Sequence, residues 1–246
     1  MSRNHLLVCL LPARDAEEDL PRCLASLSTF CDAVVALDDG SVDGTRRLLD
    51  GHPLVAEVLS RPPRVGFREW HDGELRNTLL RAAADLRPTW IVSVDSDECL
   101  AADDAAALRR FVETDAVPGC AFGLTRLRMW GADRYEAESI WHYRCVFRLF
   151  AYSPGDRFPD RRLHFNPVPT SIPDRKYVMT TIRLQDFGAC DEARTAARSA
   201  KYLEADHEDD YREYHDAVCE IPRDLRPWMP RPEGLPVILR RASDRA

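Results

Sequence analysis

Residues 92–100 read VSVDSDECL and place three carboxylates directly after an apolar run. The run Trp90–Val94 has the length and composition of a strand that is buried on both faces of a sheet. In an extended segment, residues two positions apart point to the same side, so Asp95 and Asp97 can face one point beyond the strand. Two such carboxylates repel each other unless a proton or a cation lies between them. The stretch therefore predicts either a divalent metal site or an acidic loop that caps a helix.

Strand and helix patterns alternate along the first hundred residues. Three further short apolar runs precede this one, at residues 5–11, 33–37 and 54–59. Between the runs, apolar residues recur at helical spacing, as in residues 20–27 and 75–86. The alternation predicts an α/β fold with a Rossmann-like, mostly parallel sheet and helices on both faces. Ligands of such sheets bind at the carboxyl ends of the strands, where the charged loops of this chain lie.

The 246 residues suit one domain. We expect residues 1–100 to bind the main ligand, residues 101–220 to form a second half with a smaller mixed sheet, and residues 221–246 to form a proline-rich tail. In the second half, Asp103 can cap a helix that carries Leu108, Phe111 and Val112. Residues 121–130 and 143–150 predict strands that pair, residues 153–174 a long loop, and residues 192–218 a polar helix or helix pair. Long loops in compact domains are often functional.

Composition excludes several classes of function. The net charge is -7 and no basic face is evident, which argues against a nucleic-acid partner. No apolar run reaches the roughly 20 residues that a transmembrane helix needs. The eight cysteines form no C-x-x-C pair, so a zinc site is not expected, and reduced thiols are the simpler interpretation. We therefore expect a cytoplasmic protein without a transmembrane segment, with peripheral attachment to a membrane as the alternative.

A second acidic strand end lies in VVALDDGSVDGT, residues 34–45. Asp38 and Asp39 follow the apolar run at the same predicted edge of the sheet, and two glycines allow a close approach of a ligand to the backbone. A carboxylate here can accept hydrogen bonds from a ribose or a base. The alternative is a capped turn without a ligand.

A third element is GELRNTLLRAA, residues 73–83, at the start of an amphipathic helix. Arg76 lies early in this helix and off its apolar face. A phosphate near the helix start would meet free N–H groups and a guanidinium. The alternative is an ordinary solvated helix face.

The order of these three elements resembles the inverting family 2 glycosyltransferases, which have the GT-A fold, and the resemblance covers about residues 5–100. It implies a nucleotide-diphosphate sugar, linked to UDP, as donor, and Mn²⁺ or Mg²⁺ as the cofactor. Asp95 and Asp97 would form the D-x-D pair, with Asp95 also near the donor and Asp97 the direct metal ligand. The remaining contacts of the donor would come from Pro12, Arg14, Asp15, Asp38, Asp39 and Arg76.

The match weakens after residue 100. Many members carry a metal-binding His after a late strand, and Asp186 occupies that position here. Asp186 can serve as a third metal ligand, or it can cap a turn or pair with an arginine.

Inverting transfer also needs a general base for the acceptor hydroxyl. We favour Asp160 in the long loop, with His164 as the second candidate and Asp156 and Glu138 as others. A salt bridge to a neighbouring arginine is the alternative for Asp160, and a structural role is the alternative for His164. Some relatives carry a His-Glu pair in this region, but Phe165 follows His164 here.

Two other functions compete with this prediction. A nucleotidyltransferase shares the sheet type, but it usually has a glycine-rich basic loop after its first strand, and PARDAEED is not glycine-rich. A catalytically degenerate protein that binds a nucleotide sugar without turnover is the other alternative, because Asp186 replaces the usual His. The acceptor stays open among a glycan, a lipid-linked sugar, a peptide and a small molecule.

Overall fold

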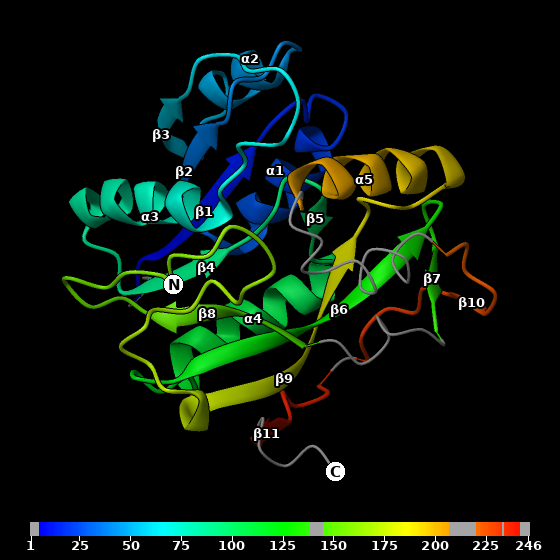
Figure 1. Cartoon of the computed structure of the whole chain (residues 1–246). Coiled ribbons are helices and arrows are strands. Elements are labelled where there is room, and N and C mark those ends of the chain that lie inside the picture. Colours follow the sequence, from blue (N-terminus) through cyan, green and yellow to red (C-terminus); the bar gives the residue numbers. More distant parts are fainter. Residues whose placement is uncertain (1–4, 138–144, 207–219, 233, 242–246) are drawn as a thin grey trace.

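The computed structural model describes residues 5–137, 145–206, 220–232 and 234–241 (Figure 1). The first half contains the elements β1 (Leu7–Ala13), α1 (Leu20–Phe30), β2 (Ala33–Asp38), α2 (Thr45–Asp50), β3 (Val55–Ser60), α3 (Asp72–Ala83), η1 (Ala84–Leu86), β4 (Trp90–Ser93) and β5 (Glu98–Cys99). The second half contains α4 (Ala102–Thr114), β6 (Ala121–Trp130), β7 (Arg134–Glu136), β8 (Cys145–Ala151), η2 (Asp174–Lys176), β9 (Tyr177–Asp186), α5 (Glu192–Ala205), β10 (Leu225–Pro227) and β11 (Leu239–Arg241).

The strands of the first half form the parallel part of the sheet. Their order is β3-β2-β1-β4, and each neighbouring pair in this row is parallel. β8 then joins β4 in the antiparallel direction, and β6 joins β8 in the same way. The carboxyl ends of β1, β2 and β4 therefore meet at one edge, as the alternating pattern predicts.

Helices cover both faces of this sheet, and β1 shows why. Its residues alternate between two apolar clusters, with Leu7, Cys9 and Leu11 in one and Val8 and Leu10 in the other. The first cluster contains the apolar faces of α1 and α4, and the second contains that of α3. A strand buried on both faces reads as a continuous apolar run rather than an alternating one, so the sequence signal and the packing agree.

The second half builds a mixed extension of the sheet. β9 runs parallel to β6, and the two-residue strand β5 pairs with the end of β9, which sets Glu98 opposite Asp186. The predicted pairing of the strands near residues 121–130 and 143–150 is confirmed over the described residues. No helix or strand interrupts residues 153–173, in agreement with the predicted long loop.

Some sequence-based expectations differ from the structure. Asp103 is not the cap of α4, because Ala101 holds the cap position and Asp103 lies inside the first turn, where it pairs with Arg183 at 3.3 Å. The tail after residue 220 contains β10 and β11, which extend the sheet at β7 and β9. The predicted helix beyond residue 206, and Glu138, lie outside the described residues.

None of the helices in the described ranges combines the length and apolar content needed to cross a bilayer.

Candidate functional site

A cavity of about 650 Å³ lies at the carboxyl edge of the parallel strands. The loops after β1, β2 and β4 supply one part of its wall. The remainder comes from α3 and the segment before it, from β6, β8 and α5, and from the long loop. Most of the predicted site residues line it, namely Pro12, Arg14, Asp15, Asp39, Arg76, Asp95, Asp97 and His164. Three others, Asp38, Asp160 and Asp186, are not among the described residues of its wall.

Asp95 is fixed by two buried arginines. Arg76 Nη2 donates to Asp95 Oδ1 at 2.6 Å, and Arg148 Nη2 donates to Asp95 Oδ2 at 2.9 Å. Burial alone would raise the pKa of Asp95, but the charges of Arg148 and Arg76 outweigh it and hold the pKa well below its usual range. Asp95 is therefore a fixed anion at the wall of the cavity.

The position of Arg76 differs from the expected phosphate contact. Its Nε donates to Asp72 at 3.0 Å, its Nη1 to Ser93 Oγ at 2.6 Å, and its Nη2 to Asp95. All three nitrogen atoms of the guanidinium thus have protein acceptors. Arg76 is 5% exposed, so its main contribution in this structure is to position Asp95.

Glu98 also positions Asp95. Its Oε2 accepts a hydrogen bond from the Asp95 amide at 2.9 Å, and its Oε1 pairs with Arg148 at 3.0 Å. Burial raises the pKa of Glu98 to about 8, in spite of the opposing charge of Arg148. The third carboxylate of VSVDSDECL therefore lies beneath the site, with 2% of the residue exposed.

Asp97 differs from its neighbours because its side chain makes no hydrogen bond or ion pair within the described part of the chain. Burial, followed by the charge of Asp186, raises the pKa of Asp97 to about 6. The charges of Arg198 and Lys201 oppose these effects only in part, and a further cation close to this carboxylate would favour its ionised form. The Asp97 carboxylate is therefore suited to bind a cation.

Gly188 makes room for this carboxylate. A Cβ atom at position 188 would lie 2.1 Å from Asp97 Oδ2 and 2.4 Å from Arg198 Nη1. Any side chain here would therefore displace Asp97 or Arg198. The backbone N–H of Gly188 donates to Asp186 Oδ1 at 3.0 Å, so this short loop contacts both carboxylates.

Asp186 is an ion-pair partner in this structure. It lies 2.9 Å from Arg198 Nη1 and 3.7 Å from Arg126 Nε, and only 2% of it is exposed. Burial would raise its pKa, but Arg198 and Arg126 outweigh this effect and lower the pKa. The arginine-paired alternative from the sequence therefore describes its contacts.

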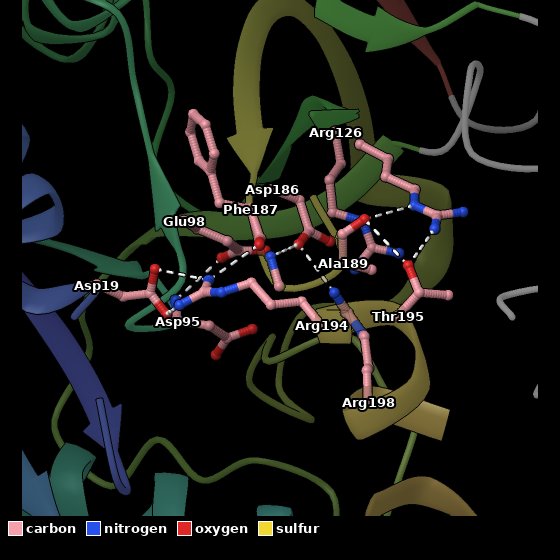
Figure 2. Close-up of polar contacts among 12 residues, drawn as sticks. Asp19, Asp95, Glu98, Arg126, Asp186, Phe187, Ala189, Arg194, Thr195 and Arg198 are labelled. Carbon is pink, nitrogen blue, oxygen red and sulfur yellow. Dashed lines mark hydrogen bonds and ion pairs between the residues drawn. The ribbon is translucent and has the colours of Figure 1, made fainter. Parts of the chain in front are cut away.

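The helix α5 is attached to the carboxyl edge by a series of ion pairs (Figure 2). Arg194 donates to both carboxylate oxygens of Asp19, at 2.8 Å and 2.9 Å, and Arg198 reaches Asp186. Arg128 of β6 donates to Thr195 Oγ1 at 2.9 Å. These contacts hold α5 across the end of the sheet, with Arg198 and Lys201 facing the cavity wall.

Asp38 and Asp39 have separate positions. Asp38 Oδ1 accepts from the Ser41 amide at 3.0 Å, so this residue shapes the turn. Asp39 lines the cavity, and its Oδ2 pairs with Arg64. Asp39 Oδ1 is buried without a hydrogen-bond partner in the described structure. A buried carboxylate oxygen in that state is an acceptor for a ligand N–H or O–H.

Arg14 holds the loop that covers Asp39. Its Nη1 donates to the Gly66 carbonyl at 2.6 Å and its Nη2 to the Arg64 carbonyl at 2.7 Å. Its guanidinium also stacks on Phe67, with 4.3 Å between the carbon and the ring centroid. Through this loop, Arg14 therefore organises the cavity wall beside Asp39.

The two candidates for the general base have different environments. The side chain of Asp160 is 92% exposed, and its Oδ1 lies 3.3 Å from His71 Nε2 rather than beside an arginine. His164 lies on the cavity wall, where its ring centroid is 5.1 Å from that of Tyr202. The structure thus brings His164, but not Asp160, to the cavity.

The carboxylates of the cavity wall are the candidate ligands for a divalent metal. No group of three His, Cys, Asp or Glu side chains with metal-binding geometry occurs within the described ranges. Mg²⁺ is commonly held by one or two carboxylates together with phosphates of the substrate. Asp97, which has no protein partner there and faces the cavity, fits this kind of site, and Asp95 lies two residues away. Asp186 fits less well, since two arginines already neutralise it.

Local sequence patterns do not identify several residues of this wall. Arg148, Arg198 and Lys201 come from β8 and α5, whose patterns mark them only as polar residues of a strand and a helix. Gly188 follows Asp186, the residue that replaces the expected His, by two positions. Its position in QDFGAC was the one available hint that a backbone had to pass close to the site.

A family model described as glycosyl transferase family 2 matches residues 9–177. The chain belongs to glycosyl transferase family 2. The match spans the whole parallel half and every cavity residue up to the long loop, so the resemblance inferred from the three acidic and basic elements is confirmed at the level of the family.

The curated relatives add no assigned activity. An uncharacterized protein of Mycobacterium tuberculosis is 27% identical over 214 residues, which cover 84% of this chain and 51% of that protein. The chain thus spans about half the length of the curated relatives it matches.

Solved structures confirm the α/β fold of GT-A type. A TarS fragment of S. aureus in complex with UDP-GlcNAc has a TM-score of 0.50 and 13% identity, over 87% of this chain and 70% of that chain. The mannosyltransferase PcManGT of Pyrobaculum calidifontis, in complex with GDP-Man and Mn²⁺, has a TM-score of 0.51 and 16% identity, over 87% and 70% of the two chains. At these identities the likeness shows the fold.

Proposed function

We propose that this family 2 domain transfers a sugar from a nucleotide-diphosphate sugar to an acceptor hydroxyl with inversion at the anomeric carbon. The observation that carries the proposal is the meeting of Asp39, Asp95 and Asp97 at one cavity on the carboxyl edge of β1, β2 and β4. Within the described residues, Asp39 Oδ1 accepts no hydrogen bond, and the Asp97 carboxylate makes neither a hydrogen bond nor an ion pair.

The nucleotide would occupy the end of the cavity near Asp39. Asp39 Oδ1 lies 4.0 Å from Arg61 Nη1 but accepts no hydrogen bond in the described structure. It would accept one from the nucleobase or the ribose, beside the wall formed by Pro12, Arg14 and Asp15. We propose UDP as the nucleotide, in keeping with the TarS complex, and test GDP as the alternative because PcManGT was solved with GDP-Man. Residues 1–100 would then bind the donor, and residues 101–220 would form the acceptor side.

Asp97 would hold Mn²⁺ or Mg²⁺, and Asp95 would stand behind it as a fixed anion. The metal, when bound, supplies positive charge to the diphosphate leaving group. Arg76, Arg148 and Glu98 contribute by fixing the position of Asp95, which needs no rearrangement during the reaction. Asp186 could serve as a third metal ligand only after its ion pair with Arg198 breaks.

His164 would take the proton of the acceptor hydroxyl as the new glycosidic bond forms. We favour His164 over Asp160 as the general base because His164 lies on the cavity wall, whereas the Asp160 side chain is 92% exposed. Trp70 also lines the cavity and offers a ring face to a sugar. The acceptor class and a cytoplasmic location, with or without attachment to a membrane, remain predictions.

A degenerate protein that binds a nucleotide sugar without turnover is the second candidate. The observation that favours it is the pairing of Asp186 with Arg198 and Arg126 at the position where many family members carry a metal-binding His. A nucleotidyltransferase is disfavoured by the match to the family 2 model.

The two candidates are separated by measuring release of nucleotide diphosphate from a panel of UDP-sugars and GDP-sugars, with Mn²⁺ and with EDTA. The glycosyltransferase should release the nucleotide from one donor in a metal-dependent manner, by slow hydrolysis or faster with an acceptor. Metal-dependent binding of UDP without release from any donor would favour the degenerate protein. Absence of binding to any nucleotide would contradict both.

A further inference from the structure

The ammonium of Lys201 lies in an aromatic recess of the cavity wall. Its Nζ is 4.5 Å from the ring centroid of Trp70, 5.2 Å from that of Phe67 and 5.9 Å from that of Tyr202. The rings contact one another, with 5.7 Å between the centroids of Trp70 and Tyr202. Three ring faces therefore hold the side chain of Lys201 in place, on the same cavity wall as Asp97.

The other cations of this wall already have anionic or carbonyl partners. Five arginines pair with carboxylates: Arg76 and Arg148 with Asp95, Arg126 and Arg198 with Asp186, and Arg194 with Asp19. Arg14 donates to two carbonyl oxygens. These arginines therefore neutralise or position protein groups.

Lys201 makes no hydrogen bond or ion pair in the described parts of the chain. An ammonium has three N–H donors, and a ring face satisfies none of them in the way an oxygen acceptor does. Burial lowers the pKa of Lys201, and the charge of Asp97 on the same wall opposes this effect only in part. A buried ammonium without a hydrogen-bond acceptor is suited to a ligand that brings negative charge. Charge-assisted bonds to phosphate oxygens match this need.

We propose that Lys201 binds the diphosphate of the donor and stabilises it as the leaving group. The inference rests on the proposed function and assigns to Lys201 the phosphate contact that the sequence suggested for Arg76. In the transfer, the bond between the anomeric carbon and the phosphate oxygen breaks and its electron pair stays on that oxygen. The acceptor oxygen forms the new bond to the carbon, and its proton goes to the base. The ammonium of Lys201 would meet the charge that develops on the diphosphate.

The chain offers a matched control because Lys176 and Lys201 are its two lysines. Lys176 lies exposed in η2, away from the cavity wall. The variants are Lys201→Met, which removes the charge, Lys201→Arg, which keeps it, and Lys176→Met. The unliganded melting temperature of each variant reports on folding.

The test is calorimetric binding of UDP, uridine and inorganic pyrophosphate, in EDTA so that metal does not contribute. Lys201→Met should weaken UDP and pyrophosphate binding by roughly 10-fold to 100-fold and leave uridine unchanged. Lys201→Arg should recover part of the loss, and Lys176→Met should match the wild type. UDP should also protect Lys201, but not Lys176, from reductive methylation, as read by peptide mass spectrometry.

The outcomes separate the two claims. If the wild-type protein and Lys201→Met bind UDP equally and Lys201 is methylated as fast with UDP as without it, the role of Lys201 is overturned while the proposed function stands. If pyrophosphate binding depends on Lys201 but no nucleotide binds better than pyrophosphate, the anion site stands and the proposed donor class fails. If the wild-type protein binds none of UDP, GDP and pyrophosphate, either in EDTA or with Mn²⁺, both are overturned.

Discussion

At the residue scale, the account depends on the space that Gly188 leaves for the Asp97 carboxylate. We expect Gly188→Ala to reduce metal-dependent nucleotide binding at least about 10-fold, because its Cβ would lie 2.1 Å from Asp97 Oδ2. Overpacking of this kind typically costs about 1–3 kcal/mol of stability, so the variant should still fold. Calorimetric titration with UDP and Mn²⁺ measures the change.

Gly51→Ala is the matched control for this variant. The closest atom to its new Cβ would be the Arg47 carbonyl oxygen at 3.2 Å, at the end of α2 and away from the cavity wall. Equal nucleotide affinities of Gly188→Ala and Gly51→Ala would show that the close approach at Gly188 has no part in binding.

His164 and Asp160 provide a second test at this scale. We expect His164→Gln to lower kcat about 100-fold or more with little change in donor KM, since a general base typically contributes about 10²-fold to 10⁴-fold. Asp160→Asn, at the exposed surface of the same loop, should keep its activity. Steady-state kinetics with the identified donor and acceptor decide between them, and the opposite pattern would return the role to Asp160.

Arg148 provides a test of stability. Arg148→Met leaves Asp95 with Arg76 alone and removes the hydrogen-bond donor to Glu98 Oε1. Removal of one partner from a buried ion pair typically costs about 3–5 kcal/mol. We therefore expect a loss of this order in the free energy of unfolding, measured by urea denaturation at pH 7. Arg110→Met, an exposed position on α4, is the control.

The loss should depend on pH with a defined sign. The charges of Arg148 and Arg76 outweigh burial and hold the folded-state pKa of Asp95 well below its usual range, so its ionised form stabilises the wild-type protein above the pKa of a free aspartate. This stabilisation disappears as the pH falls through the folded-state pKa. The difference between the wild-type protein and Arg148→Met should therefore be largest near neutral pH and shrink in acid. A difference that grows as the pH falls below 7 would contradict the assigned role of Arg148.

At the element scale, α5 connects the late part of the chain to the parallel half. Arg194 joins its first turn to Asp19, the residue before α1, and its side chain is 25% exposed. We expect Arg194→Ala to cost about 1–2 kcal/mol, below the usual value for charged hydrogen bonds because solvent screens the pair. Hydrogen exchange of the α5 amides should accelerate, and nucleotide affinity should fall.

Arg46→Ala is the comparison for α5. Arg46 pairs with Asp50 one turn along α2, and both side chains are about half exposed, at 46% and 49%. Pairs of this type contribute only about 0.3–0.5 kcal/mol. If the two substitutions change α5 exchange and nucleotide affinity equally, the Arg194 contact does not hold the helix over the site.

The elements also show which parts of this protein could be predicted from sequence. The strand ends at Asp39 and Asp95 were predictable because a doubly buried strand is a continuous apolar run, and its carboxyl end is where polar residues begin. The same local patterns could not show that Arg148 would reach Asp95, or that Lys201 would lie over Trp70. Those contacts depend on long-range packing of β8 and α5, which residue periodicity does not encode.

Arg76 and Asp103 show a second limit. The sequence placed Arg76 at the start of a helix beside the site, which the structure confirms, but three protein acceptors take up its guanidinium. Asp103 was a plausible cap, yet the chain enters α4 through Ala101, and Asp103 pairs with Arg183 of β9 instead. In both cases a tertiary partner, absent from the local sequence, decided what the side chain does.

At the scale of the whole molecule, the central claim is that the acidic edge of the sheet binds a nucleotide diphosphate together with a divalent cation. VSVDSDECL contributes three carboxylates with separate environments. Glu98 lies beneath the site, Asp95 is held by two arginines, and Asp97 has no partner in the described structure. The claim therefore depends on Asp97 more than on any other residue.

The most direct measurement is the calorimetric affinity of the wild-type protein and Asp97→Asn for UDP and GDP, each with Mn²⁺ and with EDTA. The account predicts that Mn²⁺ strengthens binding of one nucleotide to the wild-type protein. Asp97→Asn should lose this metal-dependent gain, keep its metal-free affinity and remain folded. Equal gains from Mn²⁺ in the wild-type protein and in Asp97→Asn would contradict the account.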